Sequence, residues 1–443
     1  MRSLSPISDV TPSWGSSLVH LAGLLLLTQA TTAAQVAKKC GNLDFPTVVC
    51  LDRYGTLLPG KFSRGALDVY SASSVDDTSF SNIKSASFLV FDQDKGLDVL
   101  GTAPVVEEMF DLDSAAPEAP VYVPDTNELW IGGLQTGVTS QTVVDLSQNP
   151  PKPVKRTLNP PIYAANGMRY RDGRVWVSAA GGNDTLAGGP YHPGIYSFDP
   201  KTGDSRVEAN NYYGWFINSA NDLDLDPSGR VWFTDPLYSR NMGVNTEAPL
   251  LQAAVYRYDP VSGQIQVMDD TLEFPNGIAF SPDGKILYLT NTAAGVGNID
   301  PGTPWQNAGP LKYVSTNKRT LYAFDVGTDG LLRNRRPLYT AMDYVADCVK
   351  VASNGYLVTA AGHGVDILDP TGVHLMRIQL SFLAVSIEFA GPKRDSLWII
   401  GHGKAARATI NLTGQGASTA SSRLRRHART HAKRHVAPQS ITE

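Results

Sequence analysis

The stretches NDLDLDPSGRVWFTDPLYS (221–239) and FPNGIAFSPDGKILYLTNT (274–292) share one plan. Each sets an Asn at the start of a short alternating segment, then a turn, then a second segment of aromatic and branched residues. The plan recurs six times, with 10 to 12 residues from its first residue to the matching large residue of the second segment. The six copies begin at Glu118, Asn166, Asn221, Asn276, Asp347 and Ser386.

Each copy is followed by a further alternating segment that ends in a turn, for example IYSFDPKTG (195–203) and VYRYDPVSG (255–263). Alternation with a period of two indicates strands, and repeats of about 40 to 70 residues with several strands each are typical of propeller blades. The sequence therefore predicts an all-β, six-bladed β-propeller with a central metal site. We expect the early strand SFLVFD (87–92) to pair into the last blade and close the ring.

Composition supports many short strands and argues against one class of partner. The 443 residues include 40 Gly and 29 Pro, and only 18% are charged. The formal net charge is −4, although six Lys and Arg fall between 423 and 435, so the rest of the chain is more acidic than that total. An acidic body argues against nucleic-acid binding.

The chain divides into four predicted parts. Residues 1–34 resemble a signal peptide, 35–84 form an N-terminal extension, 85–413 form the propeller, and 414–443 form a disordered basic tail. A retained N-terminal anchor is the alternative for the first part, although its apolar run is too short for a stable membrane span. No feature specifies an oligomeric state.

Several features suit a secreted, extracellular protein. Asn183 and Asn411 head glycosylation sequons, and Cys40 and Cys50 are plausible disulfide partners. Cys348 is read as a small buried residue rather than as a reactive thiol.

The first residues of the repeats are the best indication of function. In a propeller the inner strands line a central channel, so equivalent residues face one another around the axis. Two carboxylates about 5 Å apart repel by roughly 3 kcal/mol at an effective dielectric constant of 20, so one must be protonated or a cation must lie between them. An all-oxygen set without His or Cys favours Ca²⁺ over Zn²⁺. The alternative is that these residues cap turns.

At this point the sequence resembles the senescence marker protein/gluconolactonase family of six-bladed propellers, and especially its secreted fungal lactonohydrolases. The resemblance runs from about 85 to 412 and rests on 221–239, on 274–292 and on EAPVYVPDTNELW (118–130). It implies the metal ligands Glu118, Asn276 and Asp347, with Asn221 as a substrate contact and further ligand. Ser219 stands where the animal branch has a substrate-contacting Arg.

The resulting hypothesis is hydrolysis of a small-molecule lactone by metal-activated water. Most of the rate acceleration would come from stabilising the negative charge that develops on the carbonyl oxygen. Asp347 is the predicted proton acceptor, and Asn221 orients the substrate. Asn166 is a candidate fourth ligand or substrate contact. His363 and His402 are candidate rim residues, of which His363 is taken as the substrate contact; each also suits a turn.

Two other functions remain open on the same scaffold. One is a paraoxonase-like esterase or an enzyme that tailors rings in a biosynthetic pathway. The other is a non-catalytic propeller that binds a ligand.

Overall fold

The computed structural model describes residues 48–51, 62–65, 68–75, 82–113, 116–184, 186 and 191–416. The predicted signal peptide and nearly all of the basic tail lie outside these residues, and so does Cys40. Those assignments therefore stay predictions.

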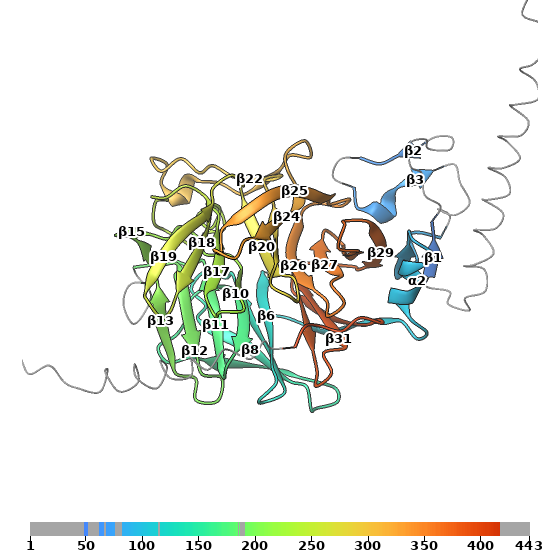
Figure 1. Ribbon diagram of the computed structural model, residues 1–443, viewed down its shortest axis with the longest axis horizontal. Coiled ribbons are helices and arrows are strands. Elements are labelled where there is room, and N and C mark those ends of the chain that lie inside the picture. The colour runs from blue at the N-terminus through green and yellow to red at the C-terminus, as the bar shows by residue number, and fades with distance from the viewer. Residues whose placement is uncertain are drawn as a thin grey trace, which may run out of the picture. The chain divides into compact units, whose positions relative to one another are not determined.

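The described chain is built almost entirely of strands, arranged as the six blades of a propeller, as predicted (Figure 1). The first three blades have four strands each, in chain order from the inside outward. They are β6 (Pro117–Val123), β7 (Glu128–Gly133), β8 (Ser140–Asp145) and β9 (Pro153–Thr157); β10 (Ala165–Arg171), β11 (Arg174–Ala179), β12 (Gly194–Phe198) and β13 (Ser205–Ala209); and β16 (Leu223–Leu225), β17 (Val231–Asp235), β18 (Ala254–Asp259) and β19 (Gln264–Asp269).

The remaining three blades include two that are completed from the N-terminal side of the chain. They are β20 (Pro275–Phe280), β21 (Ile286–Asn291), β24 (Thr320–Val326) and β25 (Leu332–Thr340); β26 (Ala346–Val351), β27 (Leu357–Ala361), β28 (Gly364–Leu368) and β29 (His374–Gln379), extended by β4 (Phe88–Val90) and β1 (Val48–Cys50); and β30 (Ser386–Ala390), β31 (Ser396–Gly401), β32 (Lys404–Thr409) and β5 (Val105–Asp111).

Smaller elements decorate this framework. They are the pairs β2 (Phe62–Ser63) with β3 (Ser74–Val75), β14 (Asn211–Tyr212) with β15 (Trp215–Phe216) and β22 (Gly295–Val296) with β23 (Lys312–Tyr313), the short helix α2 (Lys95–Leu100) and the 3-10 turns η1 (Tyr70–Ala72) and η3 (Trp305–Asn307).

The inner strands form a closed series. β6 contacts β10, and contacts continue through β16, β20, β26 and β30 back to β6. Buried clusters lie between consecutive blades; one joins Trp232 and Val255 of the third blade to Ile278 and Leu287 of the fourth. Because each sheet is covered on both faces by its neighbours, Trp130, Trp232, Tyr288 and Trp398 of the second strands are buried, while Trp176 is partly buried, which explains the strongly apolar repeats.

The ring is not closed as predicted. The segment SFLVFD contributes β4, which pairs with β29 in the fifth blade, while β5 pairs with β32 and completes the sixth. β4 lies between β29 and β1, and all three of its residues are buried. β5 is an outer strand with several exposed residues. An outer closing strand buries little of its surface, so its sequence carries a weaker apolar signal.

Other predicted features can be placed on this framework. Cys348 is a buried free thiol in β26 and Cys50 lies in β1. Asn411 is exposed, and its side-chain amide donates to the carbonyl of Asp98. Asn183 lies beside Tyr191 in an isolated bridge. None of the described helices has both the length and the apolar character that a membrane crossing needs.

Candidate functional site

The N-terminal ends of the inner strands surround a cavity of about 190 Å³. Its polar lining contains all five predicted oxygen donors, one from each of the first five blades: Glu118, Asn166, Asn221, Asn276 and Asp347. Tyr238, Tyr344 and His402 also face it, and the remaining wall is mostly apolar. Residues that are far apart in sequence are thus gathered around one space.

Irregular strand pairing accompanies four of these residues. The pairing of the inner strand with the second strand shifts between Glu118 and Val121 in β6, and between Ala165 and Gly167 in β10. It shifts in the same way across Asn276 in β20 and across Asp347 in β26. A β-bulge redirects the side chain at the irregular position, so the donors owe their inward placement to a repeated local distortion.

The glycines that follow two of the donors allow the inner strands to approach closely. A Cβ atom on Gly277 would lie 2.4 Å from the carbonyl oxygen of Asp347, and one on Gly167 would lie 2.6 Å from Asp222 Oδ1. Both glycines lie within strands rather than in turns. The Asn-Gly pairs are therefore packing features of the channel, and the turn-capping alternative does not apply to them.

Hydroxyl groups that the sequence analysis did not identify hold the backbone of the donor residues in place through hydrogen bonds. Thr290 Oγ1 accepts a hydrogen bond from the Gly277 amide (2.7 Å) and donates to the Asp347 carbonyl of the next blade (2.8 Å). Thr234 Oγ1 donates in the same way to the Asn276 carbonyl (2.7 Å). Ser178 Oγ donates to the Asn221 carbonyl (2.6 Å).

The signal for these hydroxyl residues is present in the sequence. Ser178, Thr234, Thr290 and Thr359 occupy the same place near the end of the second strand in four consecutive repeats. In the first blade this place is Gly132, where a Cβ atom would lie 2.6 Å from the carbonyl oxygen of Ala165. The second, third and fourth blades thus each hold the site residue of the next blade through a hydroxyl on the second strand. Thr359 Oγ1 instead donates to the Cys348 carbonyl in its own blade.

Tyr238 joins two of the amides. Its hydroxyl accepts hydrogen bonds from Asn276 Nδ2 (2.8 Å) and from Asn221 Nδ2. Burial, followed by the charges of Asp347 and Glu118, raises the pKa of Tyr238 well above its ordinary value, so the hydroxyl keeps its proton. A Tyr hydroxyl that accepts two hydrogen bonds still has one proton to donate.

The two carboxylates are in an unfavourable electrostatic position. Burial raises the pKa of Asp347 to about 7; a hydrogen bond from Asn276 opposes this change and the charge of Asp222 adds to it. Burial, then Asp347, then Asp222 raise the pKa of Glu118 well above its ordinary value. No Lys or Arg is among the described residues that line this cavity. A positive charge supplied from outside the chain would therefore be stabilised here.

The donor set fits a hard divalent cation. Two carboxylates and three side-chain amides offer only oxygen ligands, which Ca²⁺ prefers. Among the residues that the structure describes, no group of three or more His, Cys, Asp or Glu side chains is arranged as a metal site. A cation here would thus depend on amide oxygens. Asn166 Nδ2 is buried without a hydrogen-bond partner in the described chain, so this amide is not committed to the surrounding protein.

The two candidate histidines line different cavities. His402 lines the cavity described above, whereas His363 lines a second cavity together with Asp343 and Arg377. Burial and the nearby His363 lower the pKa of His402, so it is neutral at physiological pH. Of the two, His402 is the one placed to contact a molecule in the donor-lined cavity.

Comparison with known proteins assigns the chain to a family. Its sequence matches the family described as SMP-30/Gluconolactonase/LRE-like region over residues 116–299 and 296–402. The chain belongs to the SMP-30/gluconolactonase family. It is 44% identical to the lactonohydrolase oryH of Aspergillus oryzae, over 88% of this chain and 96% of that protein. The lactonohydrolase oryL of the same fungus is also 44% identical, over 86% and 88%.

Solved structures share the propeller. A gluconolactonase of Xanthomonas campestris matches with a TM-score of 0.56 and 24% identity, over 71% of this chain and 91% of that chain. Regucalcin of Agrobacterium tumefaciens, described as a calcium-binding protein, matches with a TM-score of 0.53 and 16% identity, over 72% and 97%. At these identities the likeness establishes the fold of the SMP-30/gluconolactonase family in this chain.

In this member of the SMP-30/gluconolactonase family, we expect Thr290→Val to reduce turnover at least about tenfold, because a small displacement of reacting groups is costly. The substitution keeps the shape of the side chain but leaves the Gly277 amide and the Asp347 carbonyl without their partner, which costs about 1–3 kcal/mol of stability. Steady-state kinetics and urea unfolding measure both effects. Thr320→Val, in the same blade and also buried, is the control. Wild-type kinetics for Thr290→Val would show that the hydroxyl does not position Asp347.

Stability without divalent cations should depend on pH in a defined direction. Folded Asp347 keeps its proton up to about pH 7, whereas the unfolded chain loses it near pH 3.8. The folded state therefore binds more protons between these values, and the free energy of unfolding should fall as pH rises through this window. Each unit of pKa shift corresponds to about 1.4 kcal/mol. Urea unfolding in a chelator tests this, and a rise in stability over the same window would contradict it.

Proposed function

We propose that this protein is a metal-dependent lactonase that opens a cyclic ester. The cation is most simply Ca²⁺, held by Glu118, Asn221, Asn276 and Asp347, with Asn166 as a further donor. The observation that carries the proposal is the meeting of five oxygen donors, including two buried carboxylates, in one cavity whose described lining has no Lys or Arg. The lactonohydrolase names of the relatives that are 44% identical support the same reaction.

The bound cation would supply charge stabilisation for the oxygen of the lactone carbonyl, the contribution that usually dominates acyl transfer. In our proposal Asp347 accepts a proton from the attacking water, because it lines the cavity beside the other oxygen donors. The water oxygen forms a bond to the carbonyl carbon, the ring carbon–oxygen bond breaks, and the ring oxygen takes up a proton. The product is a hydroxy acid.

The other polar residues would orient the substrate. Asn221 and Asn276 are held in place by Tyr238, so their amides present fixed dipoles to the cavity. Tyr238 has one remaining proton for an oxygen of the substrate, and His402 offers a neutral imidazole. Ser219, whose amide donates to Asp235 (2.6 Å), is not among the residues that line the cavity.

The apolar wall supports a hydrophobic lactone as the substrate. Besides Ala116, six larger aliphatic or thioether side chains face the cavity: Leu134, Met242, Leu311, Val345, Leu383 and Val385. Burial of a methylene group contributes about 0.8 kcal/mol, or roughly fourfold in affinity. We propose that alkyl-substituted lactones are preferred over polyhydroxylated sugar lactones.

A substrate panel tests the reaction and the preference together. We expect hydrolysis of alkyl γ-lactones, with kcat/KM increasing along the alkyl series, and slower hydrolysis of gluconolactone. Aryl esters and macrolactones complete the panel. Rapid turnover of aryl esters with none of lactones would favour the esterase alternative, and saturable binding without turnover of any ester would favour a ligand-binding propeller.

We also propose that the protein is secreted after removal of residues 1–34, glycosylated at Asn183 and Asn411, and crosslinked between Cys40 and Cys50. Mass spectrometry of the mature protein, before and after reduction and deglycosylation, measures all three. An unprocessed N-terminus would overturn the first part of this proposal.

A further inference from the structure

A second cavity, of about 160 Å³, lies at the opposite end of the same inner strands. Four of these strands, β6, β10, β20 and β26, contribute an early residue to the donor-lined cavity and a later one to this cavity. β26 supplies Asp347 and then Lys350, and β10 supplies Asn166 and then Arg169. We call this second space the lower cavity. An empty cavity of about 150 Å³ holds a benzene ring, so the lower cavity can hold a molecule of several heavy atoms.

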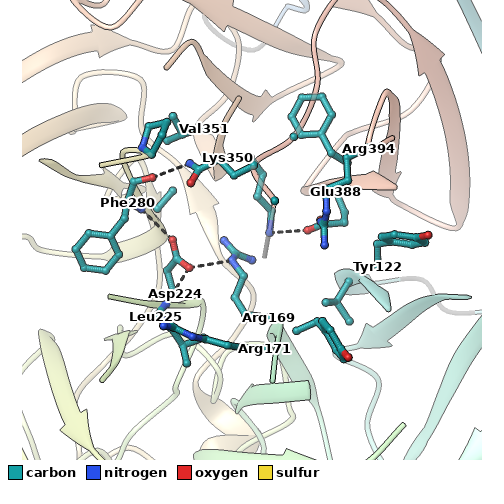
Figure 2. A pocket seen from close by; sticks show the side chains of 18 of the residues that line it. Tyr122, Arg169, Arg171, Asp224, Leu225, Phe280, Lys350, Val351, Glu388 and Arg394 are labelled. Atoms are coloured by element: carbon teal, nitrogen blue, oxygen red, sulfur yellow. Dashed lines mark hydrogen bonds and ion pairs between the residues drawn. The ribbon is translucent and has the colours of Figure 1, made fainter. Parts of the chain in front are cut away.

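The lower cavity is rich in charge (Figure 2). Four cationic and two anionic side chains are among the residues that line it: Arg169, Arg171, Lys350, Arg394, Asp224 and Glu388. The side chains of Arg169, Lys350 and Glu388 are only 14%, 10% and 10% exposed. Such groups keep much of their electrostatic strength because water is largely excluded.

The carboxylates of the lower cavity are well supplied with partners. Asp224 accepts hydrogen bonds from the backbone amides of Leu225 (2.8 Å) and Phe280 (2.9 Å), and Arg169 Nε lies 3.5 Å away. Glu388 is 3.1 Å from Lys350 Nζ and 3.6 Å from Arg394 Nη1. Each carboxylate is therefore already balanced by at least one cation.

The cations keep hydrogen-bonding capacity. Lys350 has three donors, and Glu388 is its one ion-pair partner among the described residues. The guanidinium of Arg394 lies over the ring of Tyr122, 5.4 Å from its centre, and its one ion-pair contact among the described residues is the long one to Glu388. Lys350 and Arg394 thus flank the same carboxylate, and both have donors left for a second anion beside it.

The end of the described chain forms one wall of the lower cavity. Gln415 Nε2 donates to the Phe280 carbonyl (3.0 Å), and the Gly414 amide donates to the Arg394 carbonyl (2.8 Å). A Cβ atom on Gly414 would lie 2.4 Å from Phe389, so the chain lies directly against the sixth blade. This wall spans from the sixth blade to the fourth and is held at both by hydrogen bonds, so the lower cavity has a defined boundary on this side.

We propose that the lower cavity is a second ligand site, separate from the donor-lined cavity, and that it binds a small hydroxycarboxylate. Lys350 and Arg394 bind the carboxylate group through charge-assisted hydrogen bonds. Glu388 and Asp224 accept hydrogen bonds from the hydroxyl groups. Opening of a lactone yields a hydroxycarboxylate, so the ligand of the lower cavity would belong to the same chemical class as the product of the proposed reaction. The presence of the site does not depend on that reaction.

Isothermal titration calorimetry with sodium gluconate tests the proposal, with sorbitol as the uncharged comparison. The measurement uses the Glu118→Gln protein in the presence of chelator. These conditions prevent gluconate from binding through a cation in the donor-lined cavity. We expect gluconate to bind and sorbitol not to bind. Lys350→Met should weaken gluconate binding at least about tenfold. Lys201→Met, which removes an exposed Lys paired with Asp125 at 2.7 Å, should leave it unchanged.

Three results would overturn the proposal: no gluconate binding to the Glu118→Gln protein, equal binding of sorbitol, or unchanged affinity in both Lys350→Met and Arg394→Met. The Arg394 variant also covers the case in which Lys350→Met does not fold, because Arg394 is the more exposed of the two cations. Since activity is not the readout, failure of the lactonase proposal leaves this test intact.

Discussion

Replacement of Asp347 with Asn is expected to lower kcat by about 10²–10⁴-fold, the usual contribution of a positioned general base. The Asn side chain has the same size and can still accept hydrogen bonds, but it cannot take a proton from water. Because burial disfavours the charged form of Asp347, the variant should be at least as stable as the wild type in the absence of divalent cations. Loss of activity with retained stability would therefore identify a chemical role rather than a folding defect.

Asp395→Asn is the matched control for this measurement. Asp395 is exposed in the turn before β31 and does not itself line either cavity, so its substitution should leave kcat unchanged. Turnover within about twofold of wild type for Asp347→Asn would contradict the assignment, because even a modest general base contributes about 10²-fold. The proton acceptor would then have to be sought at Glu118 or His402, the other carboxyl group and the imidazole that line the cavity.

Exhaustive chelation should remove both activity and part of the stability. A ligand present at 100 times its Kd contributes about 2.7 kcal/mol to folding. A protein of this size should then lose several degrees in Tm without the cation, because about 1 kcal/mol corresponds to roughly 2–4 °C. Lactone hydrolysis should fall below about 1% of its starting rate, as expected when charge stabilisation at the reacting oxygen is lost. Both properties should return on addition of Ca²⁺.

The variant Glu118→Gln separates a site-specific effect from a general one. Its Tm should respond much less to chelator, since one of the two carboxylates is gone. If the wild type kept its activity and its Tm in chelator, the metal-dependent proposal would be wrong. If chelation lowered Tm equally in wild type and Glu118→Gln, the stabilising cation would lie elsewhere in the molecule.

The number of blades and the donor column followed from the sequence because both are periodic. Alternating strands repeat six times, and a polar residue stands at the same place in five of the repeats, so each copy reinforces the others. Closed symmetry then implies that equivalent residues face one axis. For this reason Glu118, Asn166, Asn221, Asn276 and Asp347 could be grouped without coordinates, and the structure places all of them in one cavity.

Tertiary structure alone decided which strand closes the ring and which histidine faces the donors. β4 is strongly apolar because it lies inside a six-stranded sheet, while the closing strand β5 is largely exposed. His363 and His402 have the same local sequence, Gly-His-Gly, and only packing distributes them to different cavities. Thr290 contacts Gly277 within its own blade and Asp347 in the next blade, and both contacts lie at bulges, whose positions are set by the approach of neighbouring strands. Local patterns specify strands and their faces, whereas contacts between distant segments exist only once the ring has closed.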